Sequence, residues 1–201
     1  GGIFERAWFL MGVEDLFINM SLNPKLVDIL FEKITEYKIQ MAEITVKYGL
    51  KVGHTGDDFG GQTDLMMSKD MWNRFFRPYY KQIWDVYKKA GLPIIHHSCG
   101  NVTSIIEDLI DLGMDVLEPV QQVMDLEHLK KEYGKDITFW GGIGTQTVLP
   151  FGTSDEVRKE AEALAGKIGH KRLIVVYGEA PGSDINYIAE TIKAVYDVKA
   201  K

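Results

Sequence analysis

The sequence contains a single cysteine, Cys99, among its 201 residues. One cysteine excludes an internal disulfide framework and fits a reducing compartment, so we expect a cytoplasmic protein. No apolar run approaches the roughly 20 residues that span a bilayer, and no signal-peptide pattern opens the chain. We therefore expect no membrane segment.

Basic residues are not in excess either. The 23 Lys and Arg residues stand against 29 Asp and Glu residues, which gives a formal net charge of -6. This balance argues against nucleic acid as a partner. Hydrophobic residues make up 45% of the chain, which is enough for a substantial core. We expect one domain over residues 1–201.

Short apolar runs typical of strands alternate with periodic segments typical of helices. The longest expected helix begins at Asn23-Pro24 and extends to about Tyr48, since apolar residues recur there every three or four positions. Further helices are expected over 68–90, 101–112, 125–133, 153–168 and 184–198. The expected strands span residues 50–53, 93–97, 115–118, 137–140 and 172–177. This alternation predicts an α/β fold of βα units with a parallel sheet.

A dinucleotide-binding turn is also missing. No G-x-G-x-x-G segment follows an early strand, as an open doubly wound sheet of that kind would require. A TIM (β/α)8 barrel needs eight strands, so we expect the C-terminal part of such a barrel, with about five βα units. The chain also starts directly in an aromatic-rich segment, which favours the same interpretation.

Residues capable of metal binding or acid–base chemistry follow the ends of these expected strands, where α/β folds carry their chemistry. They are Asp57, Asp58, His97, Cys99, Glu118 and Glu179. A glycine-rich segment with Gly141, Gly142 and Gln146 follows the fourth expected strand and lacks the lysine of a P-loop. We interpret that segment as a close backbone approach to a ligand.

His97 and Cys99 are the strongest of these candidates. Side chains alternate along a strand, so residues 97 and 99 point the same way. An imidazole nitrogen and a thiolate sulfur supply half of a zinc site. The alternative is a packed cysteine beside a hydrogen-bonded histidine. His96 faces the opposite side, where we expect it to be buried against helices or hydrogen-bonded.

The acidic candidates have alternative roles as well. Asp57 and Asp58 could cap a glycine-rich loop. Glu118 precedes Pro119 at a strand end and would need a metal, a cation or a hydrogen-bond donor in a closed barrel. Glu179, considered alone, could be an ordinary loop acid. A functional role for each of them is therefore a hypothesis.

Several motifs together resemble the uroporphyrinogen decarboxylase superfamily, and within it the corrinoid and methylthiol-type methyltransferase branch. They lie at residues 56–62, 97–102, 118–121, 141–146 and 149–153. The resemblance covers essentially the whole chain. It implies a (β/α)8 barrel from which the N-terminal helices and about three strands would be absent.

The resemblance also implies a chemistry. In the methyltransferase branch, a His-x-Cys pair holds zinc with a third ligand, usually a cysteine after the last strand. His97 and Cys99 match the pair, whereas Glu179 stands where that cysteine is expected, so Glu179 or Glu118 is the expected third ligand. The implied reaction moves a methyl group between a corrinoid partner protein, or a small methylated substrate, and a thiol or corrinoid acceptor. Asp57, Asp58 and Glu118 are its expected catalytic residues.

Two other functions stay open. The first is decarboxylation of the uroporphyrinogen type, which needs no metal and relies on arginines, whereas the strand ends here are acidic. The second is a non-catalytic partial barrel that acts with a partner segment or as a homo-oligomer. An incomplete barrel would leave open sheet edges and apolar faces, which favour association.

Overall fold

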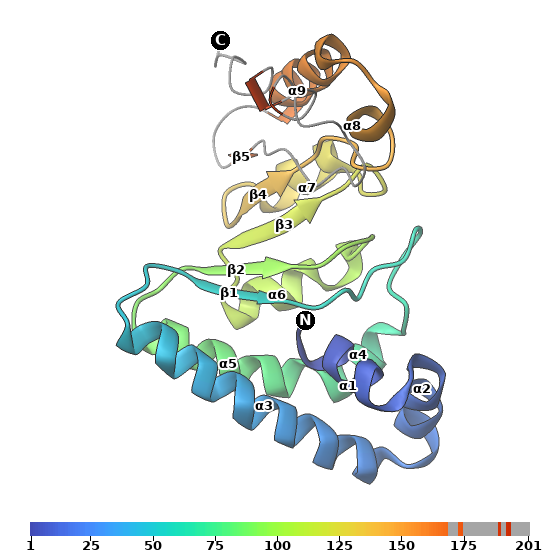
Figure 1. Ribbon diagram of the computed structural model, residues 1–201, viewed down its shortest axis with the longest axis vertical. Helices are drawn as coiled ribbons and strands as arrows, with labels where there is room; N and C mark the ends of the chain where they lie inside the picture. Colours follow the sequence, from blue (N-terminus) through green and yellow to red (C-terminus); the bar gives the residue numbers. More distant parts are fainter. Residues whose placement is uncertain (169–172, 175–188, 190–191, 194–201) are drawn as a thin grey trace. The chain divides into compact units, whose positions relative to one another are not determined.

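The computed structural model describes residues 1–168, 173–174, 189 and 192–193. Helices and strands alternate along this part of the chain, as predicted (Figure 1). The structure divides into two compact units, Gly1–Val116 and Leu117–Lys201. Among the described helices, none is both long enough and apolar enough to cross a membrane.

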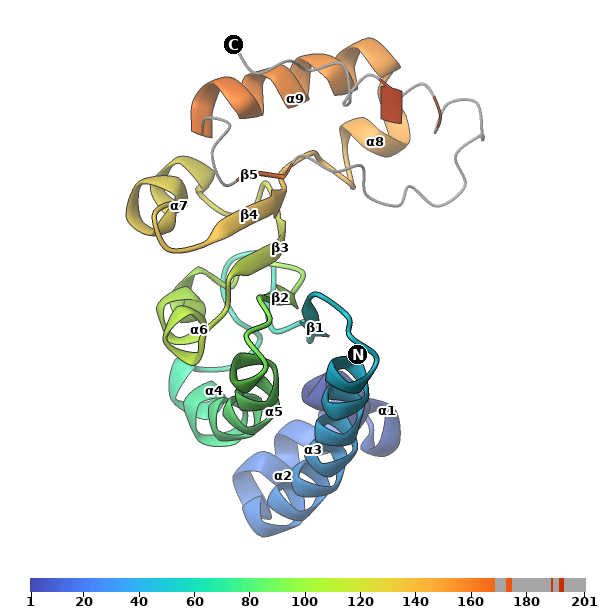
Figure 2. The same ribbon diagram turned by 90° about the vertical axis from the view of Figure 1, so that its left-hand side faces the viewer.

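The first unit begins with the helices α1 (Ile3–Met11), α2 (Val13–Leu22) and α3 (Pro24–Lys47). It continues with β1 (Gly53–Gly56), α4 (Lys69–Phe75), α5 (Arg77–Lys89), β2 (Ile94–His97), a 3-10 turn (Thr103–Ile105) and α6 (Ile106–Leu112). Helices α3 and α5 pack together and lie on the same side of β1 and β2 (Figures 1 and 2).

Helix α3 matches the helix predicted from Asn23-Pro24. Pro24 stands in its first turn, where the missing N–H group is not needed. One face of α3 is buried in the unit through Val27, Phe31, Ile34, Thr35 and Ala42. A second set of apolar residues on α3, which we call the α3 stripe, is exposed and consists of Leu26, Ile29, Tyr37, Met41, Ile44 and Tyr48.

Strands β1 and β2 pair in parallel, with Gly53 opposite Ile94 and Gly56 opposite His97. The sequence predicted the first of these strands three residues too early, at 50–53. The apolar residues before Gly53 resemble a strand, whereas Gly53–Gly56 has the composition of a turn. The Gly53 N–H donates to the Pro93 carbonyl, and the Asp57 N–H donates to the His97 carbonyl. This pairing with the β2 segment overrides the local preference of residues 53–56.

The helix predicted over 68–90 is two helices, α4 and α5, which meet at Phe76. Pro78 lies in the first turn of α5, where its missing N–H group is tolerated. In the interior of one continuous helix the same proline would remove a hydrogen bond and clash with the preceding turn. The predicted cap at Ser68 is confirmed, since its Oγ accepts the Met71 N–H at 3.2 Å. The helix predicted from Asn101 begins with the 3-10 turn instead.

The core of the first unit contains many aromatic rings. His96 is fully buried among them, with its ring 5.2 Å from Tyr80 and 5.3 Å from Trp84. Its Nδ1 lies 3.0 Å from the Thr55 Oγ1. The prediction that His96 faces the helices, opposite to His97, is confirmed.

The second unit contains β3 (Val116–Val120), α7 (Leu126–Tyr133), β4 (Thr138–Gly141), α8 (Val148–Phe151), α9 (Ser154–Ile168) and β5 (Leu173–Ile174). β4 and β5 pair in parallel. The short helix α8 was not predicted, because its Pro150 and the following Gly152 are typical of a turn. The rest of the strand predicted over 172–177 lies outside the described residues, as does nearly all of the helix predicted over 184–198.

Candidate metal centre

The residues that follow β1 and β2 lie opposite one another because the strand register continues past the strand ends. Gly56 is paired with His97, so Asp58 lies opposite Cys99 two residues further on. The Asp57 N–H donates to the His97 carbonyl at 2.9 Å. The geometry of the two loops is therefore set by the same pairing that builds the sheet.

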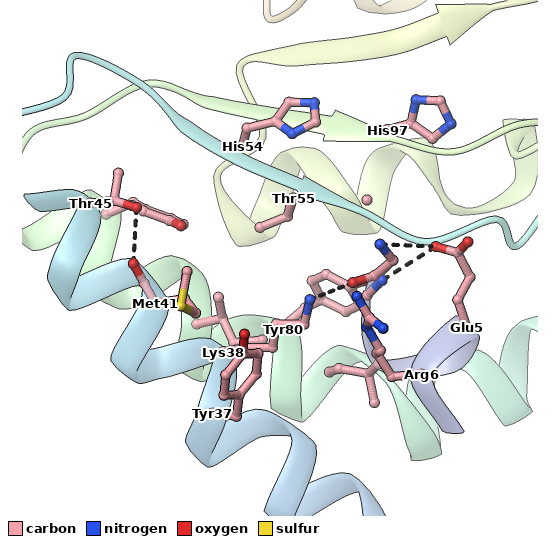
Figure 3. A pocket seen from close by; sticks show the side chains of 16 residues that line it. Glu5, Arg6, Tyr37, Lys38, Met41, Thr45, His54, Thr55, Tyr80 and His97 are labelled. Atoms are coloured by element: carbon pink, nitrogen blue, oxygen red, sulfur yellow. Dashed lines mark hydrogen bonds and ion pairs between the residues drawn. The ribbon is translucent and has the colours of Figure 1, made fainter. Parts of the chain in front are cut away.

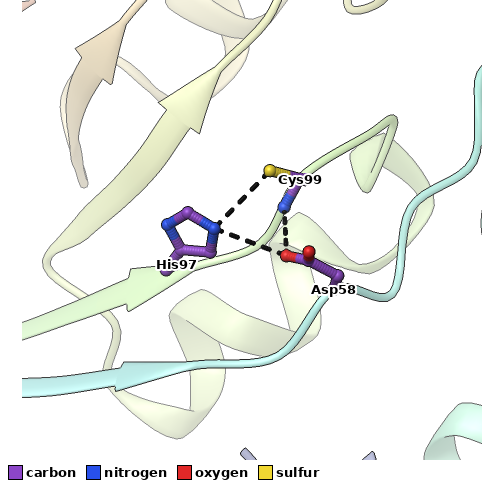
Figure 4. A group of neighbouring side chains, drawn as sticks. All are labelled: Asp58, His97 and Cys99. Atoms are coloured by element: carbon purple, nitrogen blue, oxygen red, sulfur yellow. Dashed lines mark hydrogen bonds and ion pairs between the residues drawn. The ribbon is translucent and has the colours of Figure 1, made fainter. Parts of the chain in front are cut away.

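Asp58, His97 and Cys99 converge at this point (Figure 4), and we call these three residues the triad. The Nε2 atom of His97 lies 3.4 Å from the Asp58 Oδ1 and 3.5 Å from the Cys99 Sγ. All three ligand atoms lie within 4.8 Å of one another, and the side chains are half-buried. The prediction that residues 97 and 99 point the same way agrees with this geometry.

Both triad contacts use the same ring nitrogen. In a Cys–His–Asp catalytic arrangement, the nucleophile and the acid would engage opposite nitrogens of the imidazole. Sulfur and oxygen that converge on Nε2 instead have the arrangement of ligands around one cation. Zinc bonds of about 2.0–2.3 Å at tetrahedral angles place neighbouring ligand atoms about 3.3–3.8 Å apart, and both distances from Nε2 fall in that range.

The donor set also selects among metals. Nitrogen, sulfur and one carboxylate oxygen suit zinc, whereas calcium and magnesium prefer oxygen ligands alone. The hydrogen bond from His97 lowers the pKa of Asp58, and the Cys99 N–H, which donates to Oδ1 at 2.8 Å, acts in the same direction against burial. Asp58 is therefore an anion at neutral pH, as a metal ligand must be.

The neighbouring carboxylate of Asp57 has different surroundings. It is fully buried and accepts the Phe4 N–H at 2.7 Å, the Glu5 N–H at 2.8 Å and the Tyr80 hydroxyl at 2.9 Å. Burial raises the pKa of Asp57 to about 7, although these donors oppose the shift. The Asp57 carboxyl thus anchors the start of α1, and its catalytic role stays a prediction.

A cavity of about 440 Å³ adjoins the triad and is lined by His97 together with the basic side chains of Arg6, Lys38 and His54. In Figure 3, His54 and His97 project from the same side of β1 and β2, whereas Arg6 and Lys38 come from helices on the other side. Burial lowers the pKa of Lys38, and the charge of Arg6 adds to the effect. Sequence reasoning missed Arg6 and Lys38, because isolated basic residues on helices usually belong to a solvated face.

The family model for uroporphyrinogen decarboxylase (URO-D) matches residues 1–198. The chain belongs to the uroporphyrinogen decarboxylase family. A curated relative, the uroporphyrinogen decarboxylase of Myxococcus xanthus (strain DK1622), is 27% identical over 152 residues, which cover 75% of this chain and 42% of the relative. A solved methyltransferase from Methanosarcina mazei has a TM-score of 0.78 at 22% sequence identity and matches 98% of this chain and 56% of its own.

These comparisons confirm the predicted family and the predicted α/β fold of a uroporphyrinogen decarboxylase-like barrel. The likeness to the Methanosarcina protein concerns the fold alone. Both relatives carry the names of enzymes, which supports an enzymatic role for the family. The chain spans about half the length of these relatives.

The other predicted site residues lie in the second unit or beyond the described residues. Glu118 is half-buried on β3. Gly141 and Gly142 are buried at the end of β4, and Gln146 is exposed. In the same glycine-rich segment, the Gly144 N–H donates to the Glu160 carboxylate at 2.8 Å. The roles predicted for these residues stay predictions, and Glu179 lies outside the described part of the chain.

Asp58 was predicted as a catalytic residue and not as a metal ligand. The signal that could have revealed it is its spacing from the strand end. Asp58 comes two residues after Gly56, as Cys99 comes two residues after His97, and these strand ends are paired. The sequence prediction ended the first strand at residue 53, so it did not reveal that Asp58 and Cys99 are equally far from paired strand ends.

Proposed function

We propose that this chain belongs to a zinc-dependent methyltransferase. The enzyme would move a methyl group between a corrinoid protein, or a small methylated substrate, and a thiol or corrinoid acceptor. The observation that carries the proposal is the convergence of the Asp58 oxygen and the Cys99 sulfur on Nε2 of His97. The name of the Methanosarcina relative, a methyltransferase, agrees with it.

Asp58 joins Glu118 and Glu179 as a candidate third ligand, and among the described residues it is the one that lies beside the His-x-Cys pair. Three protein ligands with a fourth position open to substrate are typical of catalytic zinc. Zinc bound there would act as a Lewis acid that lowers the pKa of a substrate thiol, so that the thiolate would form at neutral pH. The Cys99 N–H holds the Asp58 oxygen in place for this role.

The proposal requires the three ligand side chains to be deprotonated when they bind zinc. His97, Cys99 and Asp58 bind a metal in their deprotonated forms, so acid weakens the site. Cys99 is a free cysteine, which fits the reducing cytoplasm that we propose as its location. The cavity beside His97 would receive the small substrate, and its basic side chains favour an acidic group on that substrate.

The test is the zinc content of the protein together with methyl transfer from methylcobalamin to a small thiol. We expect one zinc per chain, and substitutions Cys99→Ala, His97→Ala and Asp58→Asn should each weaken zinc binding by at least about 10-fold and reduce methyl transfer in parallel. Asp64→Asn, in the same loop but outside the triad, is the matched control and should change neither. Full methyl transfer by the zinc-free protein would overturn the proposal.

The same assay separates the candidate third ligands. If Asp58 completes the site, Glu118→Gln and Glu179→Gln should leave the zinc affinity unchanged. If one of those two variants loses zinc while Asp58→Asn keeps it, the ligand set proposed here is wrong.

Decarboxylation of a polycarboxylated porphyrinogen is a second candidate function. Arg6, Lys38 and His54 line the cavity and could bind substrate carboxylates, and the Myxococcus relative is named a uroporphyrinogen decarboxylase. Carbon dioxide released from uroporphyrinogen by the metal-free protein would support this function. Arg6→Gln and Lys38→Gln should then lower the rate.

A third candidate is a non-catalytic partial barrel that acts with a partner segment or as a homo-oligomer. Its support is the exposed α3 stripe. A chain that elutes as a stable monomer in size-exclusion chromatography and transfers methyl groups would exclude this candidate.

A further inference from the structure

Hydrogen bonds connect the loop after β1 with the loop after β2 well beyond the strand ends. The Phe59 N–H donates to the Ser98 Oγ at 3.0 Å, and the Gly60 N–H donates to the Cys99 carbonyl at 3.2 Å. Further along, the Asn101 N–H donates to the Gly61 carbonyl at 2.8 Å. These bonds surround the residues that carry Asp58 and Cys99, so the separation of the two loops determines the separation of the two ligands.

The two backbones approach most closely at Gly60 and Gly100. A Cβ atom added to Gly60 would lie 2.5 Å from the Gly100 carbonyl carbon and 2.6 Å from the Asn101 nitrogen and the Cys99 carbonyl oxygen. Contacts under 3.0 Å essentially never occur for real Cβ atoms. All three neighbours are backbone atoms, so a side chain at this position would push the loops apart.

Gly100 faces the same limit from the other loop. Its φ of +81° lies in the left-handed region that favours glycine. A Cβ atom added there would lie 2.8 Å from the Gly60 Cα, and closer still to the Gly60 carbonyl group. A residue with a side chain at either glycine therefore requires a shift of the backbone, and that shift moves Asp58 relative to Cys99.

We infer that Gly60 and Gly100 are positioning residues that hold the Asp58 loop and the Cys99 loop close enough for the triad to bind one zinc ion. This inference rests on the proposed function for the identity of the metal, but the loop geometry is independent of it. Neighbouring zinc ligands lie about 3.3–3.8 Å apart, which leaves little room for a displaced Asp58. Loss of groups that orient metal ligands typically weakens metal binding about 10- to 100-fold.

The experiment compares Gly60→Ala and Gly100→Ala with two matched controls. Gly53→Ala is the control for crowding, because its Cβ would lie 2.5 Å from the Tyr87 ring at the opposite end of β1. Gly91→Ala is the control for backbone strain, because Gly91 has a φ of +69° but open space around it. Zinc affinity is measured by competition with a chromophoric chelator, and cobalt(II) substitution reports on the thiolate ligand by its absorption.

A second readout needs no metal. Cys99 is the only cysteine of the chain, so the rate of iodoacetamide alkylation in the metal-free protein reports on this thiol alone. Opening of the loops exposes the half-buried thiol, so alkylation should be faster in Gly60→Ala and Gly100→Ala than in the wild type. All variants are compared at a temperature at which their circular dichroism shows them to be folded.

We expect 10- to 100-fold weaker zinc binding and faster alkylation in Gly60→Ala and Gly100→Ala, with wild-type values of both in the controls. Wild-type zinc affinity and alkylation in both loop variants would overturn the inference, as would an equal loss in Gly53→Ala. Zinc binding that depends on these glycines in a protein without methyl transfer would overturn the proposed function and support the inference. A wild-type protein that binds no zinc would overturn both the inference and the proposed function.

Discussion

The adjacent carboxylates Asp57 and Asp58 have pKa values shifted in opposite directions, although each follows the same strand. Side chains alternate along an extended chain, so Asp57 enters the core beside Tyr80 while Asp58 reaches His97. Burial dominates for Asp57, and hydrogen bonding dominates for Asp58. A pair of identical residues is thereby divided into a structural anchor and a candidate ligand.

The raised pKa of Asp57 predicts a pH dependence of stability. Between about pH 4 and pH 7 the unfolded chain ionises this carboxyl, whereas the folded chain keeps it protonated, so the free energy of unfolding falls as the pH rises. The slope from this one group is at most about 1.4 kcal/mol per pH unit. In Asp57→Asn that part of the slope should disappear.

Urea unfolding of both proteins across this pH window measures the effect. Asp57→Asn also loses an acceptor, which should lower its free energy of unfolding by about 1–3 kcal/mol where Asp57 is protonated. Parallel pH profiles for the two proteins would contradict the assignment of a raised pKa to Asp57.

At the residue scale, the sequence predicted the direction of a side chain correctly where that direction depends on a single strand. Alternation along β2 predicted the opposite directions of His96 and His97, and the structure confirms it. The nearness of Asp58 to Cys99 depends instead on the register between two strands that are about 40 residues apart in sequence, which no local pattern encodes.

At the scale of elements, α6 is tied to α4 and α5 through Asp108. Only 7% of Asp108 is exposed, and its carboxylate lies 2.7 Å from the Lys69 Nζ and also contacts Arg77. Loss of one partner from such a buried pair is destabilising, because the remaining charges lose their compensation.

We therefore expect Asp108→Asn to lower the free energy of unfolding by about 1–3 kcal/mol without any effect on zinc binding. The matched control is Asp111→Asn, because Asp111 also contacts Arg77, at 3.5 Å, but its side chain is 63% exposed. That control should stay within about 0.5 kcal/mol of the wild type. Chemical denaturation measures both, and equal losses would contradict the importance of burial here.

Helices were easier to predict than strands in this chain. The period over residues 24–48, the cap at Ser68 and the helix over 125–133 rest on local signals, and the structure has a helix at each place with Ser68 as a cap. Strands β1 to β4 are only four or five residues long, so few positions carry their pattern. The first strand was predicted three residues too early because Gly53–Gly56 has a low β-propensity. These residues form a strand because they pair with β2, and that tertiary contact is not visible in the local sequence.

At the scale of the whole chain, the α3 stripe is an exposed apolar feature of the first unit. Its residues recur along one helix, and Ile29 is 58% exposed and Tyr48 is 75% exposed. Exposed apolar side chains along one helix face, here interrupted by Lys33, favour association with another protein surface. The family match explains the fold around the stripe without identifying what contacts it.

We expect the chain to self-associate with increasing concentration and the double variant Ile29→Glu/Ile44→Glu to do so less. Analytical ultracentrifugation over a range of concentrations measures this, and circular dichroism checks that the fold is unchanged. Lys25→Glu, at an exposed position on another face of the same helix, is the control and should behave as the wild type. Identical association of all three proteins would show that the stripe plays no part.

Motifs spread along the sequence were sufficient to identify the family and the fold class, and four of the five motifs begin within or at the end of a strand. They were not sufficient to complete the metal centre. The family resemblance offered Glu179 or Glu118 as the third ligand, and the position of a residue at a strand end does not determine which side chains meet. A ligand set is fixed by distances of a few tenths of an ångström, and these follow from loop packing.

The two adjacent histidines of β2 have a consequence for how this strand must be aligned. A shift of β2 by one residue would still present an imidazole to Asp58, because His96 would take the place of His97. Ser98 would then stand where Cys99 stands, and an oxygen would replace the sulfur. Cys99, rather than either histidine, therefore distinguishes the correct alignment of the strand from the shifted one.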